Sequence, residues 1–283
     1  MSVKDYFLPE SREDALALLA QHGPTLLVMA GGTVAMPLVN EGISLPEQVM
    51  GLRRAGLDRV ERQDGWQRIG ATTTLTRLLA ATDVPLLAEA ARLTAAWSVR
   101  NMATIGGNLF TPPPGGDVAV ALLALDATVT LASTRAERTI PLEAFFTGFM
   151  TNVLEPDELL VEIGVPIAAG EWAYLRHGRK HANTPSVVTV AIRVTRTDGR
   201  VSDARIALTG AGVHPVRARS AEQLLVGAAL DPATIGRVAA AAAEHADPPT
   251  DAVATAWYRR RMIEVIVGRA LTQLEQGQTG EGR

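Results

Sequence analysis

Two pairs of glycines are the residues of this sequence whose types and spacing suggest chemistry. The first pair lies in Ala30–Thr33, directly after the apolar run Leu26–Met29, and the second lies in Thr104–Asn108. Paired glycines let the backbone adopt positive φ and approach a bulky group closely. Backbone N–H groups that point outward from such a loop suit a phosphate. One such loop is usually only a turn, but the two together predict that both loops line the binding site of one extended phosphate ligand.

The composition limits what else the chain can do. Its 283 residues are 47% hydrophobic and 20% charged, with a formal net charge of −3, which is typical of a globular protein of one or two domains. A weakly acidic chain gives no argument for binding nucleic acid or an anionic membrane. No apolar stretch reaches membrane-spanning length, because Asp126 interrupts the longest one. No signal-peptide pattern stands at the N-terminus, so we expect a cytoplasmic protein.

The sequence contains no cysteine. This excludes disulfides, catalytic thiolates, cysteine-bound zinc and any iron–sulfur cluster held by this chain. If the chain takes part in redox chemistry, the metal centres must therefore lie on other polypeptides.

The first glycine pair has clear positioning elements. Ser11 to Gln21 is predicted to be a helix, with Ser11 as its cap and Gly23 at its end. A strand from Thr25 to Met29 then leads into the pair.

The second glycine pair follows a hairpin and two helices. Val60 to Ala71 is predicted to be the hairpin, turning at Asp64-Gly65. Thr72–Thr74 offer caps for a helix that runs through Leu79, and a second helix is expected from Pro85 to Leu93.

After the second pair, Asp117 is a good N-cap for a helix from Val118 to Leu125, which would explain this residue without any function. The alternative is that its carboxylate binds a ribose or ribityl hydroxyl. Leu159 to Val165 alternates like a strand with Leu159, Val161, Ile163 and Val165 on one face. Ile167 to Glu171 is the predicted domain boundary.

The last third of the sequence predicts a hairpin followed by helices. The hairpin joins Ser186–Thr195 to Val201–Thr209 around Asp198-Gly199. The expected helices are Ala221–Val226, Pro232–His245 and Asp251–Glu275, and Gln276–Arg283 is expected to be disordered. Regular alternation of strands and helices is lacking, which argues against a doubly wound parallel sheet.

Two further patterns favour ordinary explanations. Gly210-Ala211-Gly212 is not a dinucleotide fingerprint, because Pro215 stands where the third glycine belongs. His177 and His181 have the spacing of a metal clamp, but Arg176, Arg179 and Lys180 surround them, and a cation site is not ringed with cations. A basic loop that faces solvent or an anion is the better interpretation.

In this order, the motifs resemble the FAD-binding (medium) subunit of the molybdenum hydroxylase family, which includes xanthine dehydrogenase and carbon monoxide dehydrogenase. The resemblance covers nearly the whole chain. It rests on Ala30–Thr33, Ile69–Thr73, Val99–Leu109, Asp117, Leu122–Ala127, Glu158–Pro166, Ile206–Gly210, Pro215–Ala218 and Tyr258–Arg260. It implies an α+β chain with a FAD-binding fold of the vanillyl-alcohol-oxidase (PCMH) type, made of two α/β subdomains, over residues 1–168. A smaller α+β C-terminal domain, an antiparallel sheet plus helices, would cover residues 169–283.

The resemblance also implies a site, in which both glycine segments wrap the FAD pyrophosphate. The matching residues are Ala30, Gly31, Gly32, Thr33, Val34, Thr104, Ile105, Gly106, Gly107, Asn108, Asp117, Leu160 and Arg176. It gives this chain no catalytic residue and no metal ligand. The chain departs from the family at Gly116, where a serine is common. It also has Thr184-Pro185 where some members place a tyrosine near the flavin, so the residue that stacks on the ring stays open.

The function implied is electron transfer by FAD. A large partner with a molybdenum cofactor would hydroxylate the substrate, and a small partner with two [2Fe–2S] clusters would pass the electrons to this chain, which gives them to an external acceptor. A dimer of heterotrimers is expected. The alternatives are a self-contained flavin oxidoreductase of the same superfold and a non-catalytic module that kept the fold. The substrate stays open, because the family selects it on another chain.

Overall fold

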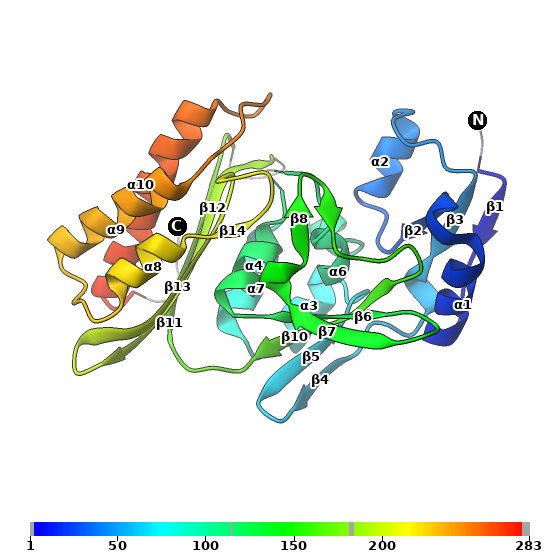
Figure 1. The fold of residues 1–283 in the computed structure, drawn as a ribbon, viewed down its shortest axis with the longest axis horizontal. Helices are drawn as coiled ribbons and strands as arrows, with labels where there is room; N and C mark the ends of the chain where they lie inside the picture. The colour runs from blue at the N-terminus through cyan, green and yellow to red at the C-terminus, as the bar shows by residue number, and fades with distance from the viewer. Residues whose placement is uncertain (1–2, 114, 181–183, 279–283) are drawn as a thin grey trace.

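The computed structural model describes residues 3–113, 115–180 and 184–278. Its three main sheets follow one another along the longest axis of the molecule, from the N-terminal part to the C-terminal helices (Figure 1). In the part of the chain that the structure describes, no helix is both long enough and apolar enough to cross a membrane.

The N-terminal part is a small parallel sheet in the order β1-β3-β2. Its elements are β1 (Asp5–Phe7), α1 (Arg12–His22), a 3-10 turn (Gly23–Thr25), β2 (Leu26–Met29), α2 (Ala35–Asn40), β3 (Gln48–Gly51) and a 3-10 turn (Leu52–Arg54). The predicted first helix is confirmed, since the Ser11 hydroxyl accepts the N–H of Asp14 and Gly23 ends the helix at φ +58°. The strand that leads into the first glycine pair is confirmed as well.

The central part is an antiparallel sheet in the order β4-β5-β10-β6-β7, covered by helices. Its strands are β4 (Val60–Gln63), β5 (Trp66–Gly70), β6 (Thr128–Ala132), β7 (Glu137–Pro141) and β10 (Leu159–Pro166), with a small hairpin of β8 (Phe146–Gly148) and β9 (Thr151–Asn152) after a 3-10 turn (Leu142–Ala144). Its helices are α3 (Leu75–Ala81), α4 (Pro85–Leu93), α5 (Trp97–Arg100), α6 (Ile105–Asn108) and α7 (Asp117–Ala124). Every residue of α7 is buried. The predicted hairpin is confirmed, with Asp64 and Gly65 both at positive φ.

Strand β10 differs from the simple alternation that its sequence indicates. Its register against β6 shifts between Leu160 and Glu162, which is a β-bulge. Leu159 and Val161 therefore pack into the N-terminal core, whereas Ile163 and Val165 pack into the central core together with Leu160. The prediction that four alternating residues share one face is wrong, because the bulge divides the strand between two cores.

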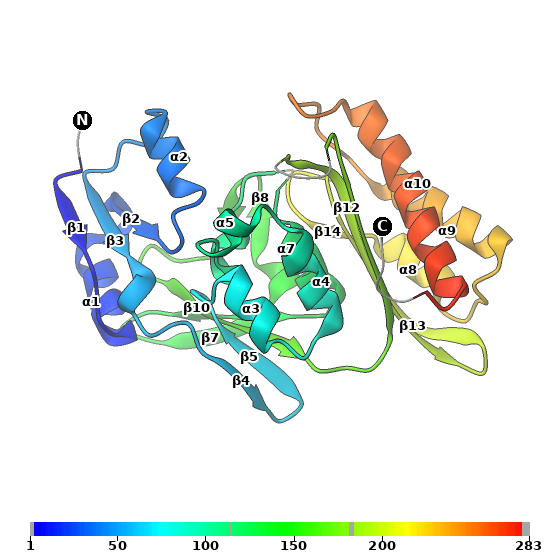
Figure 2. The same ribbon diagram turned by 180° about the vertical axis from the view of Figure 1, so that it is seen from behind.

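The C-terminal part is an antiparallel sheet in the order β11-β12-β13-β14. Its elements are β11 (Glu171–Gly178), β12 (Ser186–Thr197), β13 (Arg200–Thr209), β14 (Val216–Arg217), α8 (Arg219–Leu225), α9 (Pro232–His245) and α10 (Ala256–Glu275). Helices α8, α9 and α10 cover the outer face, and α4 and α7 lie on the inner side (Figures 1 and 2). The predicted hairpin at Asp198-Gly199 is confirmed.

The last helix begins later than predicted. It starts at Ala256, because the Thr255 hydroxyl accepts the N–H of Tyr258 as its cap. Asp251 instead forms a turn, accepting the N–H groups of Val253 and Ala254. Of the tail that was expected to be disordered, residues 279–283 lie outside the described part of the chain.

One carboxylate joins the central and C-terminal parts just after α7. Asp126 lies 3.0 Å from Arg193, 2.7 Å from Arg205 and 2.9 Å from Arg217, all three on strands of the C-terminal sheet. This convergence fixes the C-terminal sheet against α7.

Candidate functional site

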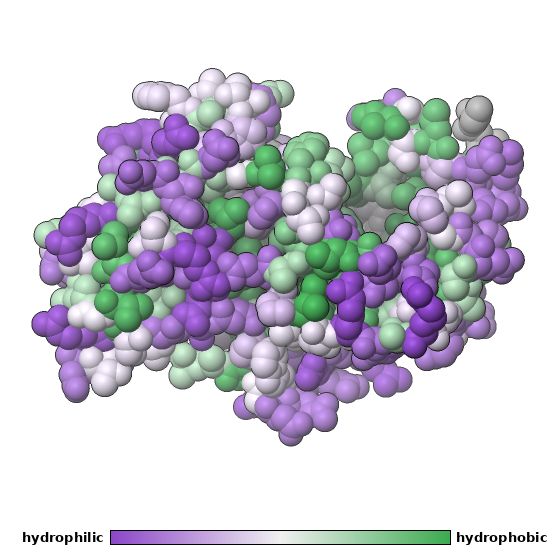
Figure 3. Space-filling model, viewed as in Figure 1, coloured by the Kyte–Doolittle hydropathy of each residue, from purple (hydrophilic) through white to green (hydrophobic). Residues whose placement is uncertain are grey.

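A cavity of about 880 Å³ lies where the three parts of the molecule meet. This volume is within the range of about 300–1,000 Å³ that is common for small-molecule and cofactor sites. Figure 3 shows a notch in the surface between α2 and the central part, with hydrophobic residues on both sides of it. Both glycine segments line the cavity, although they lie far apart in the sequence.

The first glycine segment runs between β2 and α2, and all of Ala30–Val34 lines the cavity. Gly32 has φ +72°, which only glycine adopts without strain. A Cβ at Gly31 would lie 1.8 Å from the carbonyl oxygen of Met102, so the segment touches the backbone that leads to the second pair. The N–H groups of Gly31, Gly32 and Thr33 donate to no other residue in the described part of the chain. They are therefore available to a ligand.

The second glycine segment is a single helical turn, α6, instead of an open loop. The Thr104 hydroxyl accepts the N–H of Gly107 at 3.0 Å. The N–H groups of Ile105 and Gly106 donate to carbonyl oxygens in residues 71–73, each at 2.9 Å. The expected outward row of N–H donors is wrong for this pair, because the turn and its contact with the chain after β5 use these donors.

Four of the five predicted residues in this segment line the cavity, namely Thr104, Gly106, Gly107 and Asn108. Ile105 does not, since its side chain is fully buried in the central core. A Cβ on Gly106 would lie 2.8 Å from the Cβ of Ala71, so this glycine permits close packing of protein on protein.

Asn108 caps α7, where the sequence had indicated Asp117. Its Oδ1 accepts the N–H groups of Val118 at 3.1 Å and Ala119 at 3.2 Å. The residue before α7 is Gly116 at φ +89°, and the helix begins at Asp117 itself. The prediction that Asp117 caps the helix is wrong, because its carboxylate has other partners.

We expect Asn108→Ala to destabilise the chain by about 1–2 kcal/mol, because two N–H groups at the start of α7 lose their acceptor. Urea unfolding of the FAD-free chain measures this without any contribution from the ligand. Asn108→Asp keeps the acceptor and is the matched control, with a free energy of unfolding close to that of the unmodified chain. Equal stability of all three proteins would contradict the capping role.

Asp117 is a buried junction between α7 and the C-terminal sheet, at the wall of the cavity. Its carboxylate accepts hydrogen bonds from Ser186 at 2.8 Å, Thr189 at 2.7 Å and Arg176 Nε at 3.0 Å. The Tyr174 hydroxyl donates to its carbonyl oxygen at 3.0 Å. Burial, together with the charge of Asp117, raises the pKa of Tyr174 well above its ordinary value, so this hydroxyl stays a donor. The carboxylate therefore holds α7 and the C-terminal sheet together, and its three donors leave about one of its four lone-pair sites for a ligand hydroxyl.

Arg176 places a cation on the same wall. Besides Asp117, its guanidinium contacts the carbonyl oxygen of Thr184. Thr184, Pro185 and Leu160 also line the cavity, so an aliphatic and proline surface lies beside the charge. All predicted site residues except Ile105 thus surround one cavity.

The cavity also has walls that the sequence did not indicate. They include Leu38, Ser44, Phe110–Pro113 and Asp251–Val253. The last of these is held by Arg259, whose side chain is fully buried and lies 2.7 Å from both carboxylate oxygens of Asp251. A buried arginine requires an anionic partner. The sequence signal that could have pointed to the Asp251 wall was therefore Tyr258-Arg259-Arg260.

The Asp251 turn should loosen in acid. Burial raises the pKa of its carboxyl, but the N–H of Ala254, the Arg259 guanidinium and the N–H of Val253 lower it more, so the pKa lies below its ordinary 3.8. A carboxyl whose pKa is lowered by folding stabilises the fold at pH values above its pKa in the unfolded chain. This stabilisation is lost as the pH falls through its pKa in the folded chain. We therefore expect the free energy of unfolding to fall below about pH 4, and to fall less in Asp251→Asn. Urea unfolding at pH 7 and below pH 4 measures this, and identical pH profiles would contradict it.

His177, the first member of the histidine pair, lies with its Nε2 3.1 Å from the hydroxyl of Tyr258. Burial lowers its pKa, and the charge of Arg269 lowers it further. His181 lies outside the described residues.

Two family models match the chain. One, described as the FAD binding domain in molybdopterin dehydrogenase, matches residues 1–168, and one described as the CO dehydrogenase flavoprotein C-terminal domain matches residues 172–274. The chain belongs to the FAD-binding subunits of the molybdenum hydroxylase family. It is 34% identical to the carbon monoxide dehydrogenase medium chain of Hydrogenophaga pseudoflava, over 94% of this chain and 95% of that protein. It is 33% identical to the 6-hydroxypseudooxynicotine dehydrogenase complex subunit alpha of Paenarthrobacter nicotinovorans, over 95% and 93%.

Solved structures of related proteins support the same family assignment. A Hydrogenophaga pseudoflava carbon monoxide dehydrogenase that lacks the Mo-pyranopterin moiety matches with a TM-score of 0.93 at 32% identity, over 98% of this chain and 99% of that chain. Quinoline 2-oxidoreductase from Pseudomonas putida 86 matches with a TM-score of 0.91 at 27% identity, over 98% of both chains. The family, the fold class, the oxidoreductase assignment and FAD as the cofactor of this type of subunit are confirmed.

The residues of the cavity fit FAD. Free N–H groups at Gly31–Thr33 suit a pyrophosphate, and a Cβ at Gly107 would meet only the Thr104 hydroxyl, at 2.8 Å. Asp117 can accept a hydroxyl, and the apolar walls suit a ring system.

Proposed function

We propose that this chain holds one FAD in the cavity between the two glycine segments and passes electrons through it. The observation that carries the proposal is the convergence of Ala30–Val34 and Thr104–Asn108 on one cavity of cofactor size. When bound, FAD supplies the hydride and single-electron chemistry, and the protein supplies binding and orientation. Electron transfer through FAD accordingly requires no catalytic acid or base from this chain.

The residues have distinct roles in this proposal. The N–H groups of Gly31–Thr33 bind the pyrophosphate, and Gly107 leaves room for it on the other side. Asp117 accepts a ribityl or ribose hydroxyl, with Arg176 and Leu160 beside it. Ile105 acts only by packing α6 in place, since its side chain lies in the core.

The proposal extends to the partners. A small chain with two [2Fe–2S] clusters donates the electrons, a large chain with the molybdenum cofactor hydroxylates the substrate, and an external acceptor receives the electrons. The absence of cysteine supports this division, because this chain cannot ligate such clusters. The names of the relatives, a medium chain and a complex subunit, fit a multisubunit assembly. The dimer of heterotrimers, the domain division into 1–168 and 169–283, and the cytoplasmic location stay predictions.

Gly107→Val is expected to lower the flavin content at least about tenfold, because branched methyl groups enter the space for the pyrophosphate. Gly107 does not have positive φ, but its new Cβ would lie 2.8 Å from the Thr104 hydroxyl, so the Thr104 side chain must shift as well. The measurement is flavin absorbance per chain after purification with added FAD. Gly236→Ala, in α9 where a Cβ meets nothing, is the matched control. Unchanged flavin content in Gly107→Val would count against the site.

Electron transfer is tested by mixing the FAD-loaded chain anaerobically with its chemically reduced iron–sulfur partner. We expect the flavin absorbance to bleach and to recover when an acceptor is added. Turnover of an organic substrate by the isolated chain would favour a self-contained oxidoreductase instead. A colourless protein that does not bind added FAD would contradict both.

A further inference from the structure

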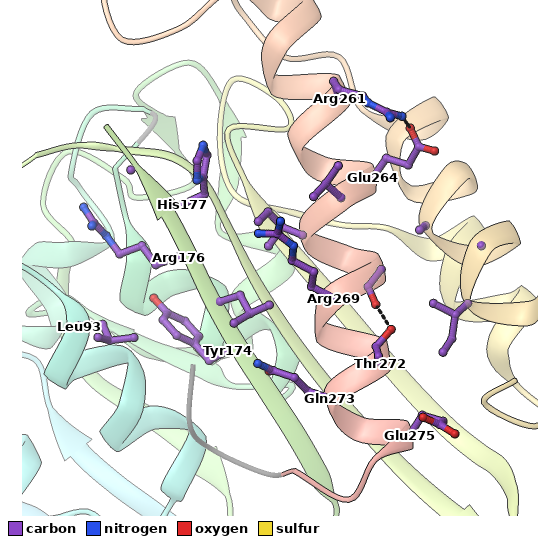
Figure 4. A pocket seen from close by; sticks show the side chains of 18 of the residues that line it. Leu93, Tyr174, Arg176, His177, Arg261, Glu264, Arg269, Thr272, Gln273 and Glu275 are labelled. Atoms are coloured by element: carbon purple, nitrogen blue, oxygen red, sulfur yellow. Dashed lines mark hydrogen bonds and ion pairs between the residues drawn. The ribbon is translucent and has the colours of Figure 1, made fainter. Parts of the chain in front are cut away.

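We propose that a groove along α10 binds an extended acidic segment of a partner protein, which adds a strand to the open edge of β11. The groove has a volume of about 1,140 Å³. The seven consecutive residues Tyr174–Lys180 form one wall, α10 runs along the groove, and part of α9 forms the far side. Figure 4 shows this arrangement, with β11 and α10 side by side. We call it the basic groove. The proposal does not depend on whether FAD is bound.

Strand β11 offers an unpaired backbone edge. It is the first strand in the order β11-β12-β13-β14, and within the described residues no other strand pairs with its outer side. It is eight residues long, whereas the other edge strands of the three main sheets have at most five. Proteins usually shorten or cover such edges. A long open edge is a template for an extended peptide, which pairs through main-chain hydrogen bonds.

Three side chains of β11 that line the groove already have hydrogen-bond partners inside the protein, on both faces of the strand, whereas its outer backbone edge has none among the described residues. On the inner face, Tyr174 and Arg176 bind Asp117. On the outer face, His177 contacts Tyr258 of α10. Figure 4 shows Tyr174 and Arg176 on one side of the strand and Arg269 on the side of α10.

The charge of the groove indicates an acidic occupant. Five cationic side chains line it, Arg176, Arg179, Lys180, Arg261 and Arg269, against the two anionic side chains of Glu264 and Glu275. The groove is therefore positive, although the chain as a whole carries −3. Complementary charge of this kind selects partners and speeds their encounter.

Three of these cations have no ion-pair partner among the described residues. Arg261 pairs with Glu264 at 2.7 Å and Arg176 pairs with Asp117 at 3.0 Å, but Arg179, Lys180 and Arg269 appear in no ion pair. They are the groups left for carboxylates of a partner. Arg176 lines both the basic groove and the cofactor cavity, so a docked segment would lie beside the cavity wall.

The test uses the full-length chain and a fluorescein-labelled octapeptide of alternating threonine and glutamate. Fluorescence anisotropy should show binding that weakens with salt, and at least about tenfold weaker binding of the threonine–lysine octapeptide. The double charge reversal Arg179→Glu with Arg269→Glu should weaken binding of the acidic peptide by about tenfold or more. The double reversal Arg59→Glu with Arg62→Glu, of two exposed arginines beside and on β4, is the matched control and should leave binding unchanged.

Hydrogen exchange separates strand addition from simple attraction of charge. The acidic peptide should slow amide exchange in Glu171–Gly178, and a version methylated at every backbone nitrogen should not, because it has no N–H to donate to the edge. Binding without protection of β11, or equal binding of the acidic and basic peptides, would overturn the proposal. A peptide that binds only after truncation beyond Gln278 would also overturn it, because the end of this chain would then be the occupant.

Discussion

Gly31→Ala is expected to destabilise the chain by about 3 kcal/mol and to abolish flavin retention. The new Cβ would lie 1.8 Å from the carbonyl oxygen of Met102, and both atoms are attached to backbone that cannot rotate away. The first glycine segment must therefore move away from the segment before α6. This movement separates the two walls of the cavity, so that binding and folding fail together. Urea unfolding and flavin absorbance measure the two effects.

Gly236→Ala is the control for this prediction. Gly236 lies inside α9, and a Cβ there meets nothing within 4 Å. Because alanine favours the helix, we expect this variant to be more stable by about 0.5–1 kcal/mol with unchanged flavin. If Gly31→Ala were to behave like Gly236→Ala, the close contact between the two segments would be refuted.

Asp117→Ala has the second large expected effect, a loss of about 3–5 kcal/mol in the free energy of unfolding of the FAD-free chain. The substitution leaves the Arg176 guanidinium, with a side-chain exposure of only 12%, without its carboxylate. It also leaves the buried hydroxyls of Ser186 and Thr189 without their acceptor. Unpaired buried polar groups carry their full desolvation cost.

Two comparisons give this prediction its controls. Adding Arg176→Leu to Asp117→Ala should recover part of the stability, because the unpaired cation is removed. Glu47→Ala removes one partner of an exposed ion pair, Lys4–Glu47, and should change stability by less than about 1 kcal/mol. If Asp117→Ala were as mild as Glu47→Ala, the junction between α7 and the C-terminal sheet would be unimportant.

The sequence predicts those features that depend on local signals. The Ser11 cap, the Asp64-Gly65 hairpin and the Asp198-Gly199 hairpin all form as expected, because each needs only its own few residues. The two glycine segments were also correctly expected to lie together. That prediction rested on their shared residue types and on the family resemblance.

The remaining features depend on contacts that no local pattern contains. Asn108 and Asp117 are both good helix caps, and the choice between them is decided by donors on β11 and β12, 59 to 72 residues after Asp117. The backbone N–H groups of Ile105 and Gly106 donate to carbonyl oxygens in residues 71–73, a segment that only the fold brings close. The bulge in β10, which divides the strand between two cores, likewise has no local signal in the alternating sequence.

One FAD is proposed to occupy the cavity between the two glycine segments. Calorimetric titration of the FAD-free chain with FAD tests this proposal most directly, in parallel with the Gly107→Val variant. We predict one FAD bound per chain, with affinity at least about tenfold lower in the variant. Binding that is absent from the unmodified chain, or equal in both proteins, would contradict it.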